Sequence, residues 1–408
     1  MKVLHTADIH IGYDTHGRLD AKTGLNSRWL DVKRSFEFMV EKAIEEDIDL
    51  FLFCGDAYRD AMPTPTEQRI FTAAVRPLLE RQIPVVCIVG NHDHPVSFGR
   101  ANALQVFPDL NGLIYLFDKP RAQDFETKSG KVRIVGLPWA SKSALAGLKQ
   151  HAHKTDEELR AEMHEIYTEF IEAQAEEAKE LPYPVILAGH LHVDVAALSE
   201  GSERIQFGRD PMFGVASLAK RAFSYVALGH IHKHQDLNPG AVERGEPPVV
   251  YSGSIERISF SEANDPKGFV IVEFDDQKRA HYRFVETPAR RFLDIAIDVR
   301  AEETPMQKVK KELEKYCASE SIVRVRIACK PAQQREIDFK AIKDQLSSAF
   351  NILPIQLIVD EERATAQPVI NKAMSMREAL VRYIDVKRHD LVQKKEKLLA
   401  KFDELAAS

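Results

Sequence analysis

Cysteine is scarce in this chain, with four residues among 408. No two of them have the Cys-x-x-Cys spacing of structural zinc sites, and their number and spacing also argue against a disulfide framework. Cys54 and Cys87 lie within apolar runs, where we expect small buried thiols rather than redox groups. The four cysteines are Cys54, Cys87, Cys317 and Cys329.

Long apolar runs are missing as well, since no stretch approaches the ~20 residues that a membrane-spanning helix requires. The opening segment MKVLHTADIH carries His and Asp inside a short apolar stretch and lacks the pattern of a signal peptide, which predicts a cytoplasmic protein with no membrane partner. Positive charge is not in excess either, because the formal net charge is -6. This balance leaves nucleic acid open as a partner, because phosphate binding depends on the Lys and Arg residues near the binding path.

Short, β-rich apolar runs alternate with longer amphipathic stretches through roughly the first 290 residues. Strands of this length separated by helical patterns are typical of an α/β domain. Apolar residues at helical spacing predict helices near 31–47, 66–82 and 155–180. The runs predicted to be strands are KVLHTA, LFLFCG, PVVCIVG, VRIVGLP, PVILAG, YVALG and VVYSGS.

A second pattern begins near Arg291 and predicts a small separate domain in the order strand, helix, strand, helix, strand. Its segments are FLDIAIDV, PMQKVKKELEKY, SIVRVRIAC, DFKAIKDQLSSAF and LPIQLIVD. After Pro368 only helix signals remain, with a mixed but mostly basic polar face. We therefore predict a main domain at 1–288, a small α+β domain at 289–365 and C-terminal helices at 366–408.

Polar side chains follow five of the predicted strands. They are Asp8 and His10, then Asp56, then Asn91, His92 and Asp93, then His190, and finally His230 and His232. Loops at the carboxyl ends of strands in an α/β sheet converge on one crevice, so these endings are expected to meet. Carboxylate, amide and imidazole donors without thiolate form a typical divalent-metal set. A lone Asp-x-His or Gly-Asp is usually a capped turn, but five such endings in order favour a metal site.

This ordered series resembles the signature of the calcineurin-like metallophosphoesterases. Within that class LHTADIHIG, GNHD, LGHIHKHQ and VVYSGSIERISFSE followed by KGF are similar to the SbcD nucleases and their relatives in the meiotic recombination eleven family. The likeness is dense over 1–275 and loose thereafter. It implies a β-sandwich of two mixed sheets flanked by helices, with a small α+β capping domain and C-terminal helices.

The resemblance also implies how the donors are divided between two divalent ions, with manganese as the expected metal. One ion is expected to be held by Asp8, His10, Asp56 and His232, and the other by Asp56, Asn91, His190 and His230. Asp56 then bridges the ions, since metals in two-metal sites lie ~3.5 to 4 Å apart.

The resemblance also implies that His92 is the candidate to protonate the leaving oxygen or to stabilise the transition state. We expect Asp93 to orient the His92 ring. The alternative for His92 is a turn residue that packs against the site.

Other residues near these motifs are not expected to be ligands. His192 matches no ligand position and is assigned a structural or substrate-facing role, and His234 is assigned to the rim. The family often carries a further histidine shortly after its Gly-Asp motif, where this chain has Tyr58 and Arg59. That departure concerns how the site admits the end of a DNA strand for exonuclease cleavage.

The metal site indicates phosphoester hydrolysis but does not identify the substrate, because one fold serves many substrates. The resemblance implies a 3′ to 5′ double-strand exonuclease and single-strand endonuclease of DNA repair, with Ser252, Ser254 and Arg257 as donors to the DNA backbone. It also implies a homodimer and a terminal helix that grips the coiled coil of an SMC-like ATPase of the SbcC type. The alternatives are a metallophosphatase of nucleotides or other small phosphoesters, a non-catalytic scaffold, and a terminal helix docked on its own domain.

Overall fold

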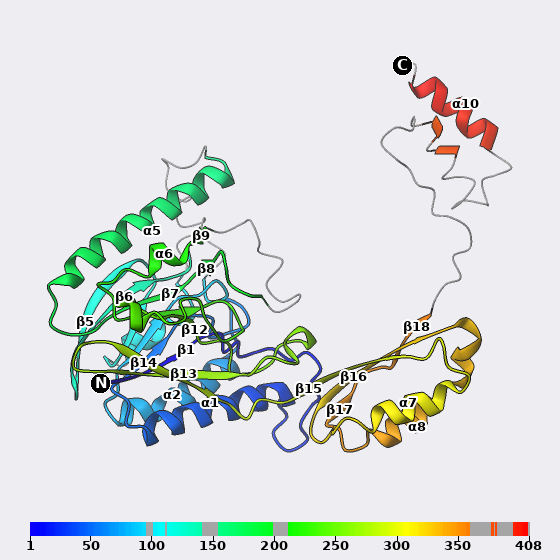
Figure 1. Cartoon of the computed structure of the whole chain (residues 1–408), viewed down its shortest axis with the longest axis horizontal. Coiled ribbons are helices and arrows are strands. Elements are labelled where there is room, and N and C mark those ends of the chain that lie inside the picture. Colours follow the sequence, from blue (N-terminus) through cyan, green and yellow to red (C-terminus); the bar gives the residue numbers. More distant parts are fainter. Residues whose placement is uncertain are drawn as a thin grey trace. The chain divides into compact units, whose positions relative to one another are not determined.

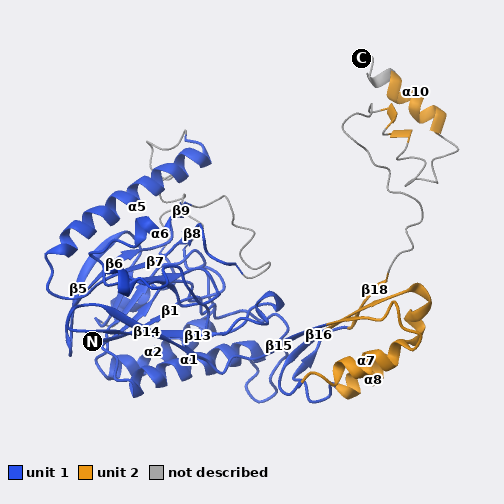
Figure 2. Cartoon of the chain, viewed as in Figure 1, with its two compact units in different colours: residues 1–295, 317–324, 346–354 blue, residues 296–316, 325–345, 355–408 orange. Residues whose placement is uncertain are grey.

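The computed structural model describes residues 1–94, 101–110, 112–140, 154–198, 211–359, 377–378, 380–381 and 395–406. The chain divides into two compact units (Figure 2), and the first comprises Met1–Ile295, Cys317–Arg324 and Leu346–Pro354. The second holds the remaining described residues from Ala296 onward. The domain limits expected from the sequence, at residues 288 and 365, stay a prediction.

Two six-stranded mixed sheets form the frame of the first unit (Figure 1). The first sheet has the order β14 (Ala280–Glu286), β13 (Gly268–Phe274), β1 (Lys2–Thr6), β2 (Leu50–Phe53), β3 (Val85–Ile88) and β4 (Ile114–Phe117). The second has the order β11 (Gln235–Asp236), β12 (Val249–Tyr251), β10 (Tyr225–Gly229), β7 (Val185–His190), β6 (Gly130–Leu137) and β5 (Arg121–Thr127). Strands β1 to β4 run parallel, and so do β6, β7, β10 and β12.

The two sheets pack face to face, and strand alternation explains the core between them. Successive side chains of a strand point to opposite faces. In β2, Leu50 and Leu52 therefore join the core between the sheets, together with Ile134 and Ala188 of the second sheet. Phe51 faces the opposite way, toward the helices. Because both faces are covered, these strands appear in the sequence as continuous apolar runs rather than alternating ones.

Helices cover the outer face of each sheet. Helices α1 (Ser27–Glu45) and α2 (Pro65–Glu80) pack on the first sheet, and α5 (Asp156–Lys179) packs on the second (Figure 1). Capping fixes where they begin: Asn26 accepts a hydrogen bond from the amide of Arg28, and α2 and α5 each start with a capping box. The expected α/β sandwich of two mixed sheets flanked by helices is confirmed.

Short elements complete the first unit. They are α3 (Val106–Leu110), β8 (His192–Val193), β9 (Met212–Phe213), α6 (Val215–Leu218), and the 3₁₀ turns at Val242–Arg244 and Phe260–Glu262. The turn at Phe260–Glu262 lies in the segment that follows the last of the predicted metal ligands, and its Glu262 contacts one of them, as described below.

The pattern expected after Arg291 is present. It comprises β15 (Phe292–Asp298), α7 (Pro305–Leu313), β16 (Ile322–Cys329), the 3₁₀ turn Pro331–Glu336, α8 (Phe339–Gln345), β17 (Asn351–Ile352) and β18 (Gln356–Val359). Strand β16 pairs with β15, β17 and β18 in one sheet. The short β17 was not expected, because its two residues fall in the connection between the predicted helix, which ends at Phe350, and the predicted strand, which begins at Leu353.

Most of the predicted terminal helix lies outside the described residues. Within the described part, α10 (Lys395–Ala406) is helical, and Arg377 pairs with Asp403 at 2.9 Å. Of the basic and apolar residues on which the prediction of this helix rests, six fall outside the described residues: Arg382, Ile384, Lys387, Arg388, Leu391 and Lys394. Among the described helices, none combines the length and the apolar character needed to cross a bilayer.

Candidate metal centre

The predicted donors meet where the parallel strands of both sheets end. Asp8, Asp56 and Asn91 follow β1, β2 and β3, while His190 ends β7 and His230 follows β10. Gly229 permits the two sheets to approach here, because a Cβ at this position would collide with the carbonyl oxygen of Cys54. Parallel strands thus bring residues more than 200 positions apart to one edge, as the sequence pattern predicts.

Four site residues have left-handed backbones, a conformation that costs a non-glycine residue of order 1–3 kcal/mol. The φ angles are 54° at Asp8, 51° at His10, 62° at Asp56 and 100° at His230. Neighbouring groups hold these turns: the Asp8 amide donates to Gly55 at 2.9 Å and the His10 amide to Asp56 at 3.1 Å. Such clustering of backbone strain is characteristic of functional sites.

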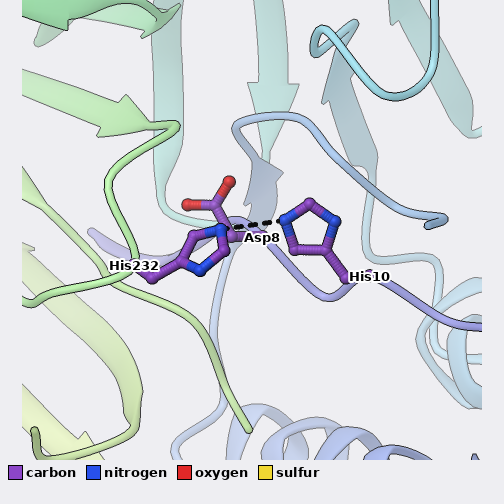
Figure 3. A group of neighbouring side chains, drawn as sticks. All are labelled: Asp8, His10 and His232. Atoms are coloured by element: carbon purple, nitrogen blue, oxygen red, sulfur yellow. Dashed lines mark hydrogen bonds between the residues drawn. The ribbon is translucent and has the colours of Figure 1, made fainter. Parts of the chain in front are cut away.

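Asp8, His10 and His232 form one side of the centre (Figure 3). The Nε2 atoms of the two histidines face each other at 3.0 Å, and all three residues are buried. Two neutral imidazole lone pairs at that distance repel each other unless a proton or a cation lies between them. The Nδ1 atom of His10 is buried without a hydrogen-bond partner, so the ring is not held from its far side.

Asp56, Asn91, His190 and His230 form the other side. Asn91 Oδ1 lies 2.9 Å from His190 Nε2 and 3.3 Å from His230 Nδ1. Asp56 Oδ2 lies 3.4 Å from His190 Nε2 and 3.7 Å from His10 Nε2, so one carboxylate oxygen faces both sides. Cys54 O accepts from His190 Nδ1 at 2.8 Å, which leaves Nε2 directed into the centre.

Burial and mutual charge perturb these groups strongly. Burial raises the pKa of Asp8 to about 6, and it holds the pKa of His10 and of His230 well below the usual range. Burial also opposes ionisation of Asp56, but His190 and the other histidines hold its pKa below normal. Although burial lowers the pKa of His190, the carboxylates of Asp56 and Asp8 raise it to about 9. A cation bound here would take the place of the His190 proton.

The donor set therefore fits divalent metal ions. Oxygen and imidazole nitrogen converge without thiolate, and the groups Asp8–His10–His232 and Asp8–Asp56–His190 each place one donor atom per residue within 4.8 Å of the others. Asp56 faces both halves, as a bridging ligand must. The assignment of each residue to a particular ion stays a prediction.

Sequence similarity to known proteins agrees with this donor set. The sequence model of the calcineurin-like phosphoesterase family matches residues 1–234, more than half of the chain. The chain belongs to this family. It is 28% identical over 290 residues to the SbcD component of the nuclease SbcCD from Bacillus subtilis (strain 168), a match that covers 70% of this chain and 69% of that protein.

Solved structures with partial likeness include a putative 5′-nucleotidase from Staphylococcus aureus, at 13% identity and a TM-score of 0.39. That match covers 70% of this chain, which spans about half (54%) of the nucleotidase. A dimetal phosphatase from Danio rerio matches at 12% identity and a TM-score of 0.38, covering 67% of this chain and 92% of that one.

In this phosphoesterase, His92 is partly exposed and Asp93 is buried, and the two side chains have different hydrogen-bond partners. His92 Nδ1 donates to the carbonyl of Arg59 at 2.6 Å, and its ring lies 4.8 Å from that of His10. The Asp93 carboxylate is fully buried and accepts the backbone amides of Asp56, Ala57 and Gly90 at 2.8 to 3.0 Å. The expectation that Asp93 orients the His92 ring is therefore corrected: Arg59 O holds the ring, and Asp93 holds the turn that carries Asp56.

The residues not expected to be ligands are placed around the phosphoesterase centre. His192 lies against the His230 ring with centroids 5.7 Å apart, and His234 Nδ1 donates to Tyr251 O at 2.9 Å while its ring stacks on Phe284. Tyr58 is fully buried among apolar side chains, whereas the Arg59 side chain is half exposed and pairs with Asp14 at 3.2 Å. Arg59 is thus the residue of this pair that faces the rim.

Among the residues that contact the predicted ligands, Glu262, Lys267 and Trp139 were not assigned from the sequence. Glu262 Oε1 lies 3.0 Å from His232 Nδ1, and Lys267 donates to His232 O at 3.1 Å. The ring of Trp139 lies 4.9 Å from that of His230. Glu262 and Lys267 fall within the quoted motifs VVYSGSIERISFSE and KGF, and Trp139 follows the predicted strand VRIVGLP, but no local pattern told which ligand each would meet.

The histidines of the segment GHIHKH should differ in their effect on metal content. We expect His230→Ala to lower the manganese retained per chain by at least about half, because His230 lines the centre, whereas His234→Ala should retain the wild-type amount. Elemental analysis of desalted protein after loading with manganese measures this. Equal metal loss in both variants would contradict the division of the three histidines.

Proposed function

We propose that this metallophosphoesterase is a dimetal DNA nuclease that acts on double-strand breaks with an SMC-like ATPase of the SbcC type. The expected activities are a 3′ to 5′ double-strand exonuclease and a single-strand endonuclease, with manganese as the metal. The observation that carries the proposal is the likeness to SbcD, whose 290 matched residues exceed the 234 matched by the family as a whole. The likeness therefore continues past the metal centre common to all these enzymes.

The side chains of the centre suit phosphodiester hydrolysis. Two divalent ions would make water nucleophilic and stabilise the charge on the phosphate oxygens. Asp56, whose Oδ2 faces both halves, would fix their separation, and two carboxylates would leave the loaded site about doubly positive toward an anionic substrate. His190 must give up its proton before it ligates, because only neutral imidazole binds metal.

His92 would serve the leaving group. Its Nδ1 proton is committed to Arg59 O, so Nε2 is the atom that faces a substrate, and it would donate a proton or a hydrogen bond only when the ring carries a second proton. The His92 amide donates to Asp56 Oδ1 at 2.8 Å, which ties its position to the proposed bridging carboxylate. The ring is partly exposed and thus accessible to a substrate, whereas the neighbouring His10 is buried.

The positions of Ser252, Ser254 and Arg257 do not support their predicted contact with DNA. Both serines are fully buried, and their hydroxyls donate to Gly253 O and Glu256 O. Arg257 donates to three backbone carbonyls, those of Ala263, Asp265 and Arg290. These bonds favour a role in holding the loop, so backbone contacts to DNA would have to come from other residues.

The remaining parts of the proposal concern partners. Residues 289–365 would act as a capping domain, and the basic terminal helices at 366–408 would bind the ATPase coiled coil. We also propose a homodimer and a cytoplasmic location. These rest on the resemblance to the SbcD family.

Digestion of end-labelled duplex and hairpin DNA, with and without the ATPase partner, tests the function. We expect manganese-dependent shortening of duplex ends and opening of hairpins, both lost on chelation, because the phosphoryl charge is stabilised by the metals. A chromogenic phosphomonoester serves as the comparison substrate. Rapid monoester cleavage with intact duplex ends would favour a small-molecule phosphatase, and no turnover of either substrate would favour a scaffold.

A further inference from the structure

We propose that Glu262 is a positioning residue that fixes the tautomer and the orientation of His232 for metal binding. The inference rests on the assignment of His232 as a ligand in the proposed function, and it does not depend on which phosphoester is the substrate. Glu262 is no metal donor itself, because its two carboxylate oxygens are engaged on the side of His232 that faces away from the centre.

The bond between Glu262 and His232 decides which ring nitrogen is available. Glu262 Oε1 lies 3.0 Å from His232 Nδ1, and a carboxylate oxygen only accepts. The proton is therefore on Nδ1, and the lone pair of Nε2 points at His10 and the metal centre (Figure 3). Metal-bound histidines commonly donate their second nitrogen in this way, and the partner raises the basicity of the ligand.

Lys267 contacts both Glu262 and the backbone of His232. Its ammonium group contacts Glu262 Oε2 at 2.8 Å, His232 O at 3.1 Å and Ser254 Oγ at 2.9 Å, which uses all three of its protons. Glu262 Oε2 also accepts the amide of Ile258 at 3.1 Å. Both the ring and the backbone of His232 are thus held by one ion pair whose side chains are 0% exposed.

The contrast with His10 makes this support specific. His10 Nδ1 is buried without a hydrogen-bond partner, and its ring is held by the rings of Tyr13 and His92, with centroids at 5.5 and 4.8 Å. A buried network whose hydrogen bonds are all made holds the side chain in one geometry. Ring packing alone leaves rotation of the imidazole about its Cβ–Cγ bond less restricted. Of the two facing imidazoles, His232 is therefore the one that is preset as a ligand.

Replacing Glu262 by glutamine removes one acceptor without changing the volume. The amide has a single oxygen, so it cannot serve both His232 Nδ1 and the donors Lys267 and Ile258. We expect Glu262→Gln to weaken manganese binding about 10- to 100-fold at one of two sites and to leave the other near wild type. Calorimetric titration of manganese into metal-stripped protein resolves the two affinities, with Glu246→Gln as a matched control, since Glu246 is a partly buried glutamate bonded to Arg244.

Nitrogen-15 spectra of histidine-labelled, metal-free protein give a second readout. The His232 Nδ1–H tautomer should dominate in the wild type and be mixed or reversed in Glu262→Gln, with His232→Asn used to assign the signals. If Glu262→Gln does not fold, Glu262→Asp carries the same test, because it keeps the charge beside Lys267 but shortens the reach by one methylene.

The outcomes separate the inference from the assignment it rests on. Unchanged affinities and tautomer in the Glu262 variant would overturn the inference, as would equal weakening of both sites with a fall in metal-free melting temperature, which marks a structural role only. If His232→Asn binds two manganese ions as the wild type does, His232 is not a ligand and the proposed assignment fails instead.

Discussion

Asp56→Asn is expected to lower phosphodiester turnover by about 10³-fold or more while sparing the fold. Asp56 Oδ2 faces both halves of the centre, and asparagine removes the charge that would hold two cations close together. The amide oxygen can still accept the His92 amide that now bonds Oδ1 at 2.8 Å, so the local turn should persist. Manganese-dependent kcat on bis(p-nitrophenyl) phosphate and on duplex DNA measures the effect.

Asp60→Asn is the matched control for this loss. Asp60 lies four positions along the chain, its side chain is 64% exposed, and its nearest cationic partner is Arg59 at 3.9 Å. Such an exposed pair contributes little, so activity should stay within about two-fold of the wild type. Asp56→Asn protein with wild-type turnover and an unaltered circular dichroism spectrum would refute the two-metal assignment.

Asp31→Ala is expected to lower the free energy of unfolding of the first unit by about 3–5 kcal/mol. Asp31 is 2% exposed, and its carboxylate accepts two hydrogen bonds from the Arg290 guanidinium, each at 2.7 Å. It also accepts a hydrogen bond from the Arg28 guanidinium at 2.6 Å. Its removal leaves two buried guanidinium groups short of a counter-charge, and loss of one partner of a buried pair costs far more than the pair itself contributes. Urea denaturation followed by tryptophan fluorescence reports this, since Trp29 lies in the same helix.

Glu80→Ala provides the comparison for stability in the same unit. Glu80 pairs with Arg76 in an exposed contact on α2, with side chains 62% and 70% exposed. Loss of an exposed pair should cost no more than about 1 kcal/mol. A similar small change for Asp31→Ala would show that the Arg28–Asp31–Arg290 network is dispensable.

Local pattern was sufficient for the frame of the fold. The apolar runs predicted as strands appear as β1, β2, β3, β6, β7, β10 and β12. They are recognisable because strands covered on both faces need apolar residues at every position. Capping shifted one helix start: α1 begins at Ser27 rather than near residue 31, because Asn26 caps it and Arg28 and Asp31 are buried polar residues that interrupt the apolar spacing.

Among the strands that were missed, β4, β5 and β14 lie at sheet edges, but β4 and β13 are mostly buried apolar runs, IYLF and GFVIVEF, that were not recognised. Strand β5 (Arg121–Thr127) is partly exposed and mixes polar with apolar residues, so its sequence has no continuous apolar run. Strands β13 and β14 form an antiparallel pair, and β14 alternates exposure at the edge of the first sheet. Edge strands take their place from pairing with a neighbour, which local composition does not encode.

The sequence by itself determined the family, the kinds of donor and their order along the chain, because each donor directly follows its own buried strand. Only the tertiary structure decided which atoms meet. Asp93 supports the Asp56 turn instead of the His92 ring, Ser254 is turned inward, and Glu262 reaches His232 from 30 positions away. The physical reason is that hydrogen-bond partners of buried polar groups come from whichever loop the packing brings near, and sequence spacing sets no such distance.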